Sequence, residues 1–455
     1  MKKFNKTNYL IKLKIRRWLQ NYSRYLYIGI SCLFICVIGV YFAYSKFFVS
    51  KEEVVIKTTV GNFTQGDVII GAYIDNEYSN TIPGKNDGYT VEKVVCDNEA
   101  IGKWDIDNWG LLTTNLTKKT KCSIYFVKFI SKVTDIIANL DVTGKCPTLN
   151  DNGSVSVTDI EETDGYLCKA KDDYGDSYYY RGVVTNNYVK FAGFYWRIVR
   201  INGDGTIRVV YDGTSAHANG ESSTDRQIGK SAFNSQNDDN AYIGYMYGTI
   251  GASTYNATHT NTNNSTIKTY IDNWYKTNIL GTVNEQYLAD NVFCNDRSIS
   301  TYSASANTKL GYGKNITYYR WFYGPWNGTD HGNSNILLKC PQQNDAFTVR
   351  DTVKGNGALT YPIGLLSTDE IVLAGGWNNN NSNYYLYSGQ YWWAATPHSF
   401  RDSIANERNI AATGNVYYYN YNTASSRGVR PVLNLKAEVL ANGDGTMNNP
   451  YRLEE

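Results

Sequence analysis

The chain has 455 residues, of which 44 are Lys or Arg and 42 are Asp or Glu, and aromatic residues make up 14% of it. This aromatic content supplies ample apolar surface for a core, which excludes a disordered chain. Eight basic residues and no acidic one lie in the first 24 positions: Lys2, Lys3, Lys6, Lys12, Lys14, Arg16, Arg17 and Arg24. Subtracting these eight leaves 36 basic and 42 acidic side chains, a net charge of −6, which excludes a nucleic-acid surface on the remainder.

Residues 25–44, YLYIGISCLFICVIGVYFAY, form an uncharged stretch whose tyrosines crowd both ends. At 1.5 Å per residue, a helix of about twenty residues spans roughly 30 Å, the hydrocarbon thickness of a bilayer. Tyrosine rings favour the two membrane–water interfaces. The pattern predicts a transmembrane helix within segment 25–48.

The positive-inside rule places residues 1–24 in the cytoplasm as a basic tail. The sequence after the helix, Ser45-Lys46-Phe47-Phe48, is a poor site for signal-peptide cleavage. We therefore expect an uncleaved single-pass anchor in the cell membrane, with the C-terminal bulk extracellular.

Residues 51–130 are expected to form a small β-sandwich-like domain of the immunoglobulin type. Short β-branched runs occur at sandwich-like spacing: VVIKTTV, DVIIGAYI, YTVEKVVC, LLTTNL and CSIYFVKF. The domain is interpreted either as a spacer that lifts the next domain off the membrane or as a ligand-binding module.

Six cysteines follow the predicted membrane segment: Cys96, Cys122, Cys146, Cys168, Cys294 and Cys340. An even number in an extracytoplasmic region favours disulfides, although six cysteines allow fifteen pairings. Pairing of nearest neighbours would close one loop in each of three segments. A zinc site is disfavoured because the sequence lacks a CxxC pair and a Cys/His cluster.

Residues 131–180 are interpreted as a linker, a turn-rich, acidic junction that also holds cysteines. Asp172, Asp173 and Asp176 are possible calcium ligands, but they lack the spacing and the closing Glu of an EF-hand loop. A solvated loop is the preferred interpretation. No cofactor or metal is predicted, and the question of a structural calcium stays open.

The last segment, 181–455, is expected to be an α+β domain with irregular loops. A β-hairpin is predicted where YVKFAGFYWRIVRI and TIRVVYDG flank the turn 202–205, NGDG, which recurs at 442–445. A helix is predicted from an apolar stripe with Ser265 or Thr266 as its N-cap: Ile267, Tyr270, Ile271, Trp274 and Tyr275. A second helix is predicted from the capping box that begins at Ser367. YWWAA and RPVLNL are expected to be core strands.

The chain resembles a family of uncharacterised single-pass surface proteins of gut-type bacteria, almost from end to end. The stretches that carry the resemblance are the membrane segment with TTVG after it, VEKVVCDNEAIGKWD, FAGFYWRIVRINGDGTIRVVYDG, FCNDRS with LLKCPQ, YPIGLLSTDEIVLAGG, YWWAATP and RGVRPVLNL. The resemblance implies a C-type-lectin-like C-terminal domain, the scaffold of formylglycine-generating (sulfatase-modifying) enzymes and of hypervariable bacterial and phage receptors. It carries no assigned activity.

The resemblance disfavours the sulfatase-modifying activity, because the reactive cysteines of those enzymes lie late in the domain and no cysteine follows Cys340 here. The calcium-binding motifs of lectins are also absent from the sequence. His398, with Asp402 four residues later, is the best candidate for a catalytic base. A single histidine is weak support, so no catalytic residue is assigned.

The favoured function is a surface-displayed module that binds a glycan or a protein. Exposed tyrosines and asparagines combine rigid amphipathic rings with adaptable hydrogen bonding. The predicted ligand-binding residues are Tyr384, Tyr385, Tyr387, Tyr417, Tyr419, Tyr421 and Arg427. The alternatives are a structural or adhesive surface protein without a small ligand and, less favoured, an enzyme that acts on glycans or the cell wall.

Overall fold

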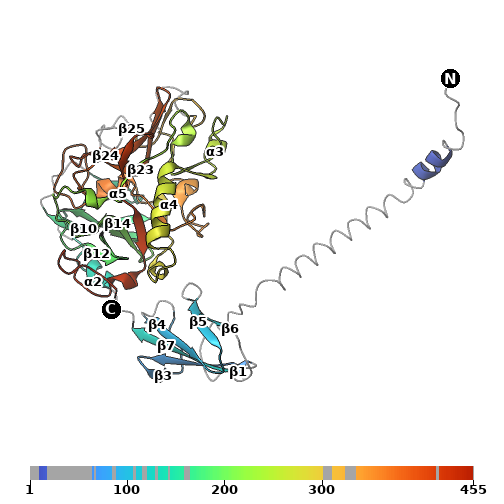
Figure 1. The fold of residues 1–455 in the computed structure, drawn as a ribbon, viewed down its shortest axis with the longest axis vertical. Helices are drawn as coiled ribbons and strands as arrows, with labels where there is room; N and C mark the ends of the chain where they lie inside the picture. The colour runs from blue at the N-terminus through green and yellow to red at the C-terminus, as the bar shows by residue number, and fades with distance from the viewer. Residues whose placement is uncertain are drawn as a thin grey trace. The chain divides into compact units, whose positions relative to one another are not determined.

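The structure is a computed structural model. It describes residues 10–17, 64–65, 68–84, 89–105, 109–114, 120–128, 132–141, 144–157, 164–300, 310–322, 335–416 and 420–453. The predicted membrane segment, 25–48, lies outside these ranges, and of the predicted tail only a short helix over 10–17 is described. Among the described residues, no helix combines the length and apolarity needed to cross a bilayer. The chain divides into two compact units, Met1–Phe129 and Ile130–Glu455, which are both rich in strands (Figure 1).

The smaller unit contains a five-stranded sheet and a hairpin. The sheet has the order β1-β2-β7-β4 with β3 beside β2, and β5 pairs with β6. The strands are β1 (Thr64–Gln65), β2 (Val68–Ile74), β3 (Glu77–Ser79), β4 (Tyr89–Cys96), β5 (Ile101–Asp105), β6 (Gly110–Thr114) and β7 (Thr120–Lys128). β2 and β7 run parallel, whereas β4 is antiparallel to β7. The predicted strands are confirmed except VVIKTTV, which lies outside the described residues.

The larger unit contains two main sheets. The seven-stranded sheet has the order β10-β11-β13-β14-β27-β22 with β12 beside β13, and the six-stranded sheet has the order β15-β26-β23-β24-β25 with β19 beside β23. The strands of the first are β10 (Gly165–Asp172), β11 (Gly175–Gly182), β12 (Tyr188–Phe191), β13 (Phe194–Ile201), β14 (Ile207–Gly213), β22 (Ile363–Gly364) and β27 (Val432–Leu435). Those of the second are β15 (Lys230–Ala232), β19 (Thr317–Tyr318), β23 (Trp392–Arg401), β24 (Ile404–Ile410), β25 (Asn420–Asn422) and β26 (Ser426–Gly428).

Short pairings and helices complete this unit. Its minor strands are β8 (Thr148–Leu149), β9 (Val155–Ser156), β16 (Met246–Tyr247), β17 (Asn263–Asn264), β18 (Phe293–Cys294), β20 (Asn335–Ile336) and β21 (Ala346–Phe347). The α-helices are α2 (Val133–Ile137), α3 (Tyr255–Thr258), α4 (Thr266–Asn278) and α5 (Thr368–Leu373). The 3-10 helices are η1 (Thr224–Arg226), η2 (Asn240–Tyr242), η3 (Glu285–Tyr287), η5 (Gln343–Asp345) and η6 (Ala437–Leu440).

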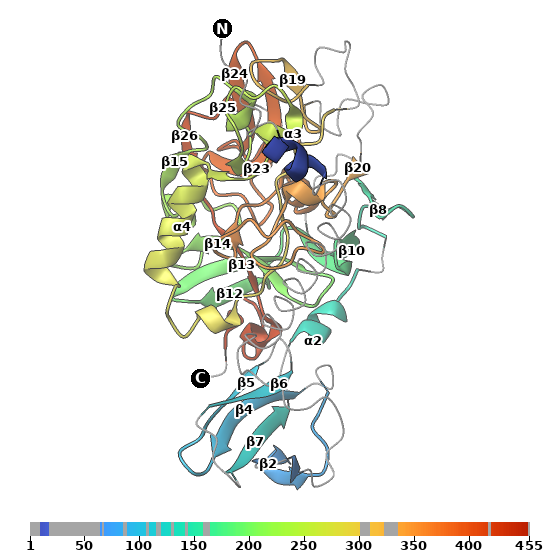
Figure 2. The ribbon, with the colours of Figure 1, turned by 90° about the vertical axis from the view of Figure 1, so that its right-hand side faces the viewer.

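Two helices join the main sheets. α4 contacts β15 of one sheet and β22 of the other, and α5 contacts β11 and β23. Figure 2 shows α4 beside β15. The predicted stripe of α4 is confirmed: Ile267, Ile271 and Tyr275 are fully buried, and Ser265 is the N-cap. The predicted capping box of α5 is also present, between Ser367 and Glu370. Because both helices bury residues against two sheets, the core is continuous between them.

The two predicted NGDG turns, 202–205 and 442–445, are stabilised by the same pattern of hydrogen bonds. Asp204 Oδ1 accepts from the backbone N–H and the hydroxyl of Thr206 at 3.0 and 2.6 Å, and Asp444 does the same for Thr446 at 3.0 and 2.7 Å. The first turn joins β13 to β14, which confirms the predicted hairpin.

The predicted linker, 131–180, ends at the wrong residue. Residues 165–180 form strands of the seven-stranded sheet, and Leu167 and Ala170 belong to its core. Asp172 and Asp176, which were expected in a solvated loop, flank the β10–β11 turn instead. The buried apolar residues of this acidic stretch therefore outweigh its turn-rich composition.

The six extracytoplasmic cysteines pair as nearest neighbours: Cys96–Cys122, Cys146–Cys168 and Cys294–Cys340. Disulfides persist in oxidising compartments, so these three indicate an extracellular or secreted location for both units.

Candidate functional site

The predicted tyrosine surface is not assembled as expected. Tyr384 and Tyr385 are fully buried in the main core. The backbone N–H of Tyr385 donates to Gly182 O at 3.0 Å, and its carbonyl accepts from Arg226 at 2.9 Å, so the segment is tied to the interior. An exposed ligand cannot reach these two rings, which corrects their assignment as ligand-binding residues.

The other predicted residues are dispersed or undescribed. Tyr387 is half-buried against the main core. Arg427 is half-buried on β26, with its guanidinium 5.2 Å from the ring centre of Tyr391, which is 39% exposed. Tyr417 and Tyr419 lie outside the described residues, and of Tyr421 only the backbone, in β25, is described. The described part of this set therefore forms no single exposed face.

An open groove of about 460 Å³ lies instead at the tip of the β12–β13 hairpin, beside the C-terminal segment. Its volume falls within the range of about 300 to 1,000 Å³ that is usual for small-ligand sites. The lining residues are Lys190, Phe191, Ala192, Tyr195, Asn284, Asn448, Asn449, Pro450, Arg452 and Leu453.

The hairpin tip is set by a two-residue turn. Ala192 and Gly193 both have positive φ, 51° and 83°, as the tight turns that match strand twist require. Lys190 and Tyr195 lie directly opposite each other across this hairpin, so their side chains share one face. The ammonium of Lys190 is 5.9 Å from the centre of the Tyr195 ring.

The C-terminal segment forms the other wall. Its backbone follows β12, because Lys190 N–H donates to Tyr451 O at 2.8 Å and Tyr451 N–H donates to Tyr188 O at 2.9 Å. Arg452 exchanges two backbone hydrogen bonds with Asn442, each of 3.0 Å. The wall is therefore held on both sides by backbone pairing.

Among the described residues that line the groove, two are cations and none is a carboxylate. Nη1 of Arg452 donates to Asn449 Oδ1 at 2.9 Å and to Pro450 O at 3.2 Å, both of them neutral acceptors. Within the described ranges, neither Lys190 nor Arg452 forms an ion pair. Both cations can therefore act on a ligand.

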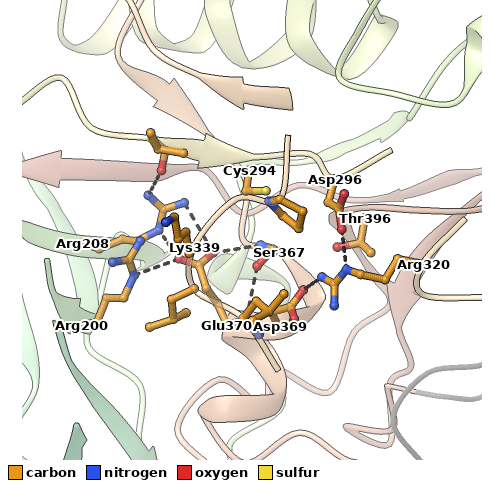
Figure 3. A pocket seen from close by; sticks show the side chains of 14 residues that line it. Arg200, Arg208, Cys294, Asp296, Arg320, Lys339, Ser367, Asp369, Glu370 and Thr396 are labelled. Carbon is orange, nitrogen blue, oxygen red and sulfur yellow. Dashed lines mark hydrogen bonds and ion pairs between the residues drawn. The ribbon is translucent and has the colours of Figure 1, made fainter. Parts of the chain in front are cut away.

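A second cavity, shown in Figure 3, is lined by arginines that are paired with carboxylates. Arg200 contacts Asp172 at 2.5 Å and Glu370 at 3.2 Å, and Arg208 contacts Glu370 at 2.5 Å. Nearby, Arg320 contacts Asp296 and also Asp369, the latter at 2.5 Å. The cavity volume is about 10 Å³, roughly the space of one water molecule. A network of this kind stabilises the position of α5 and leaves no room for a substrate.

The electrostatics of this network follow from burial and pairing. Burial lowers the pKa of Arg208 to about 10 despite Glu370. For Arg200, burial also lowers the pKa, but Asp172 and Glu370 outweigh it, so that its pKa lies above the ordinary value. Cys294, which also lines the cavity, is held in a disulfide and is not a free thiol.

The candidate base His398 does not meet its expected partner. The ring is buried in β23, where burial and the cations Arg408 and Arg401 lower its pKa well below the ordinary value. Its Nδ1 lies 2.8 Å from Ser399 Oγ. Asp402 lies on the exposed turn after β23 and contacts Arg401 at 3.8 Å. The two residues therefore do not form an acid–base pair. No cluster of three metal-ligating side chains occurs among the residues that the structure describes.

The groove could not be predicted from the sequence because its walls come from positions that are far apart in the chain: 190–195, 284 and 448–453. The turn at Ala192-Gly193 gave only a weak signal, because alanine is not among the residues that favour the first position of a two-residue hairpin turn. Nothing in the sequence indicated that Arg452 would lie beside it. In comparisons with known proteins, the chain matches no family model, no curated protein and no solved structure.

Proposed function

We propose that this protein is a membrane-anchored extracellular binding module and that its larger unit recognises a glycan at the groove beside β12. The observation that carries the proposal is the composition of that groove: the half-buried ring of Tyr195, three asparagine amides, and two cations that form no ion pair with a described residue. Aromatic faces stack on sugar rings, and amides match hydroxyl groups as donors and acceptors.

The anchorage and the finer fold are part of the same proposal. The uncharged stretch 25–44 and the basic tail support a single-pass anchor with the N-terminus in the cytoplasm, and the disulfides support an exterior bulk. The smaller unit consists of a five-stranded sheet and a two-stranded hairpin, which supports an immunoglobulin-like sandwich domain. Two sheets joined by helices and closed by disulfides support a C-type-lectin-like larger unit.

The test is glycan-array binding of the full chain purified in detergent. We expect saturable binding that Tyr195→Ala weakens at least tenfold. Tyr391→Ala is the matched control, because it removes an exposed tyrosine beside Arg427, on the surface first predicted from sequence.

Two outcomes would contradict the proposal. Loss of binding in Tyr391→Ala, with binding retained in Tyr195→Ala, would indicate that the glycan binds at the surface around Arg427. Absence of glycan binding together with self-association of the chain would favour the structural or adhesive alternative.

A further inference from the structure

We infer that the groove selects acidic sugars, with the anionic group held by Arg452 and Lys190 and the sugar ring against Tyr195. This inference rests on the proposed function and adds the chemical class of the ligand. It follows from three features of the groove: its charge, the partners of Arg452 and the geometry of the hairpin.

The charge of the groove differs in sign from that of the chain around it. The sequence after the predicted tail has a net charge of −6, whereas the described residues that line the groove include two cations and no acid. In the charged cavity of Figure 3, by contrast, each arginine contacts a carboxylate. A local positive site on an otherwise acidic chain attracts anions, whereas the acidic surface away from the site repels them.

The partners of Arg452 orient its guanidinium without neutralising it. Both acceptors of Nη1, on Asn449 and Pro450, are uncharged. Its Nε and Nη2 make no hydrogen bond to any described residue. Those two nitrogens form a fork that matches the two oxygens of a carboxylate or a sulfate, and such charge-assisted pairs are strong and geometrically specific.

The hairpin fixes the backbone positions of Lys190 and Tyr195 before a ligand arrives. Lys190 and Tyr195 face each other across the tight turn at Ala192-Gly193, so their backbones are fixed by strand pairing. A preformed site loses less conformational entropy on binding than a flexible loop does. The arrangement puts a cation next to an aromatic face, as an acidic pyranose requires.

The experiment compares matched ligands on the full chain in detergent. Acidic oligosaccharides, carboxylated or sulfated, are presented beside the same oligosaccharides with the carboxylate esterified or the sulfate removed. We expect at least tenfold tighter binding of the acidic forms, with a preference that falls at high salt because the groove is open to water. Arg452→Gln and Lys190→Gln should each abolish most of that preference. Lys230→Gln, at an exposed lysine on β15, makes the same change in net charge and should leave it intact.

The outcomes separate this inference from the proposed function. Equal binding of acidic and neutralised forms, lost in Tyr195→Ala, would overturn the inference and leave a glycan-binding groove. Acidic preference that survives in both Arg452→Gln and Lys190→Gln would overturn it as well, because the anion would then bind elsewhere. Absence of binding to every form would overturn both.

Discussion

Asp345 accepts two hydrogen bonds from Arg297 at a single oxygen, Oδ1, which lies 2.7 Å from Nε and 2.5 Å from Nη2, and both side chains are fully buried. Arg297 also donates to Met246 O at 2.9 Å and to Asn261 Oδ1 at 2.8 Å. One guanidinium therefore holds together segments that lie up to 99 positions apart in the sequence, from 246 to 345.

Arg297→Met should destabilise the larger unit by about 3 to 5 kcal/mol, because it leaves the carboxylate of Asp345 buried without its positively charged partner. Urea unfolding of the full chain, followed by tryptophan fluorescence, measures the change. Lys314→Met is the control. Its ion pair with Asp238 is 3.4 Å long and well exposed, so the stability should change by less than about 0.5 kcal/mol. Equal losses of stability in the two variants would contradict the prediction that the buried ion pair of Arg297 stabilises the larger unit more than an exposed pair does.

Asp173 should make the stability depend on pH. Burial raises its pKa from 3.8 to about 6, although its carboxylate accepts from Cys340 N–H at 3.1 Å. Because the folded state holds this proton more tightly than the unfolded state, the contribution of Asp173 to the free energy of unfolding is largest below pH 4. It is lost as the pH rises to about 6 and stays low above that pH.

Asp173→Asn should therefore stabilise the larger unit by about 1 to 2 kcal/mol at pH 7.5, because asparagine keeps the acceptor and carries no buried charge. The gain should nearly vanish at pH 4, where the folded wild-type side chain is already neutral. Urea unfolding at the two pH values gives the comparison. A stability difference that is independent of pH, or a loss of stability at pH 7.5, would contradict this assignment.

The sequence predicts the parts of this fold that depend on neighbouring residues. The stripe and cap of α4, the capping box of α5 and the turn at Asp204 are all specified within a few positions. Partners far apart in the sequence were not predictable in this way. Arg200 contacts Glu370, 170 positions away, and nothing local distinguishes this arginine from a solvent-exposed one.

The burial of the tyrosines could not be predicted from neighbouring residues either. A tyrosine fits both a core and a surface, because its ring is apolar and its hydroxyl is polar. Whether Tyr385 is exposed depends on whether β11 and the arginines around it cover its segment, and that is decided by the whole unit. The groove could not be predicted for a similar reason, since the lysine, the tyrosine and the arginine that define it come from both ends of the domain.

The disulfide between Cys294 and Cys340 closes a loop of 46 positions in the larger unit. Replacing both cysteines by alanine should cost about 4 kcal/mol on the chain-entropy estimate. The same double replacement at Cys96 and Cys122 is the control: their separation is 26 positions, so the loss should be about 3.5 kcal/mol and confined to the transition of the smaller unit. Unfolding of both variants would be followed in urea.

Alkylation of the purified native chain provides a second measurement of the disulfides. No label should enter at Cys294 or Cys340 until a reductant is added. Free alkylation of these two thiols in protein purified without reductant would contradict both the bond and the oxidising, extracellular location inferred from it.

Tyr385 tests whether the buried tyrosines contribute to ligand binding or to packing. Its hydroxyl has no hydrogen-bond partner among the described residues, and the guanidinium of Arg197 lies 5.4 Å from its ring centre. Tyr385→Phe keeps the ring and removes a buried polar atom, so stability should stay unchanged or rise by up to about 1 kcal/mol. Tyr385→Ala leaves a cavity and should cost about 3 to 5 kcal/mol. Glycan binding by Tyr385→Phe should equal that of the wild type, because no ligand reaches the buried hydroxyl. A fivefold loss of glycan binding by Tyr385→Phe at unchanged stability would indicate that Tyr385 contacts the ligand and would contradict its assignment to the core.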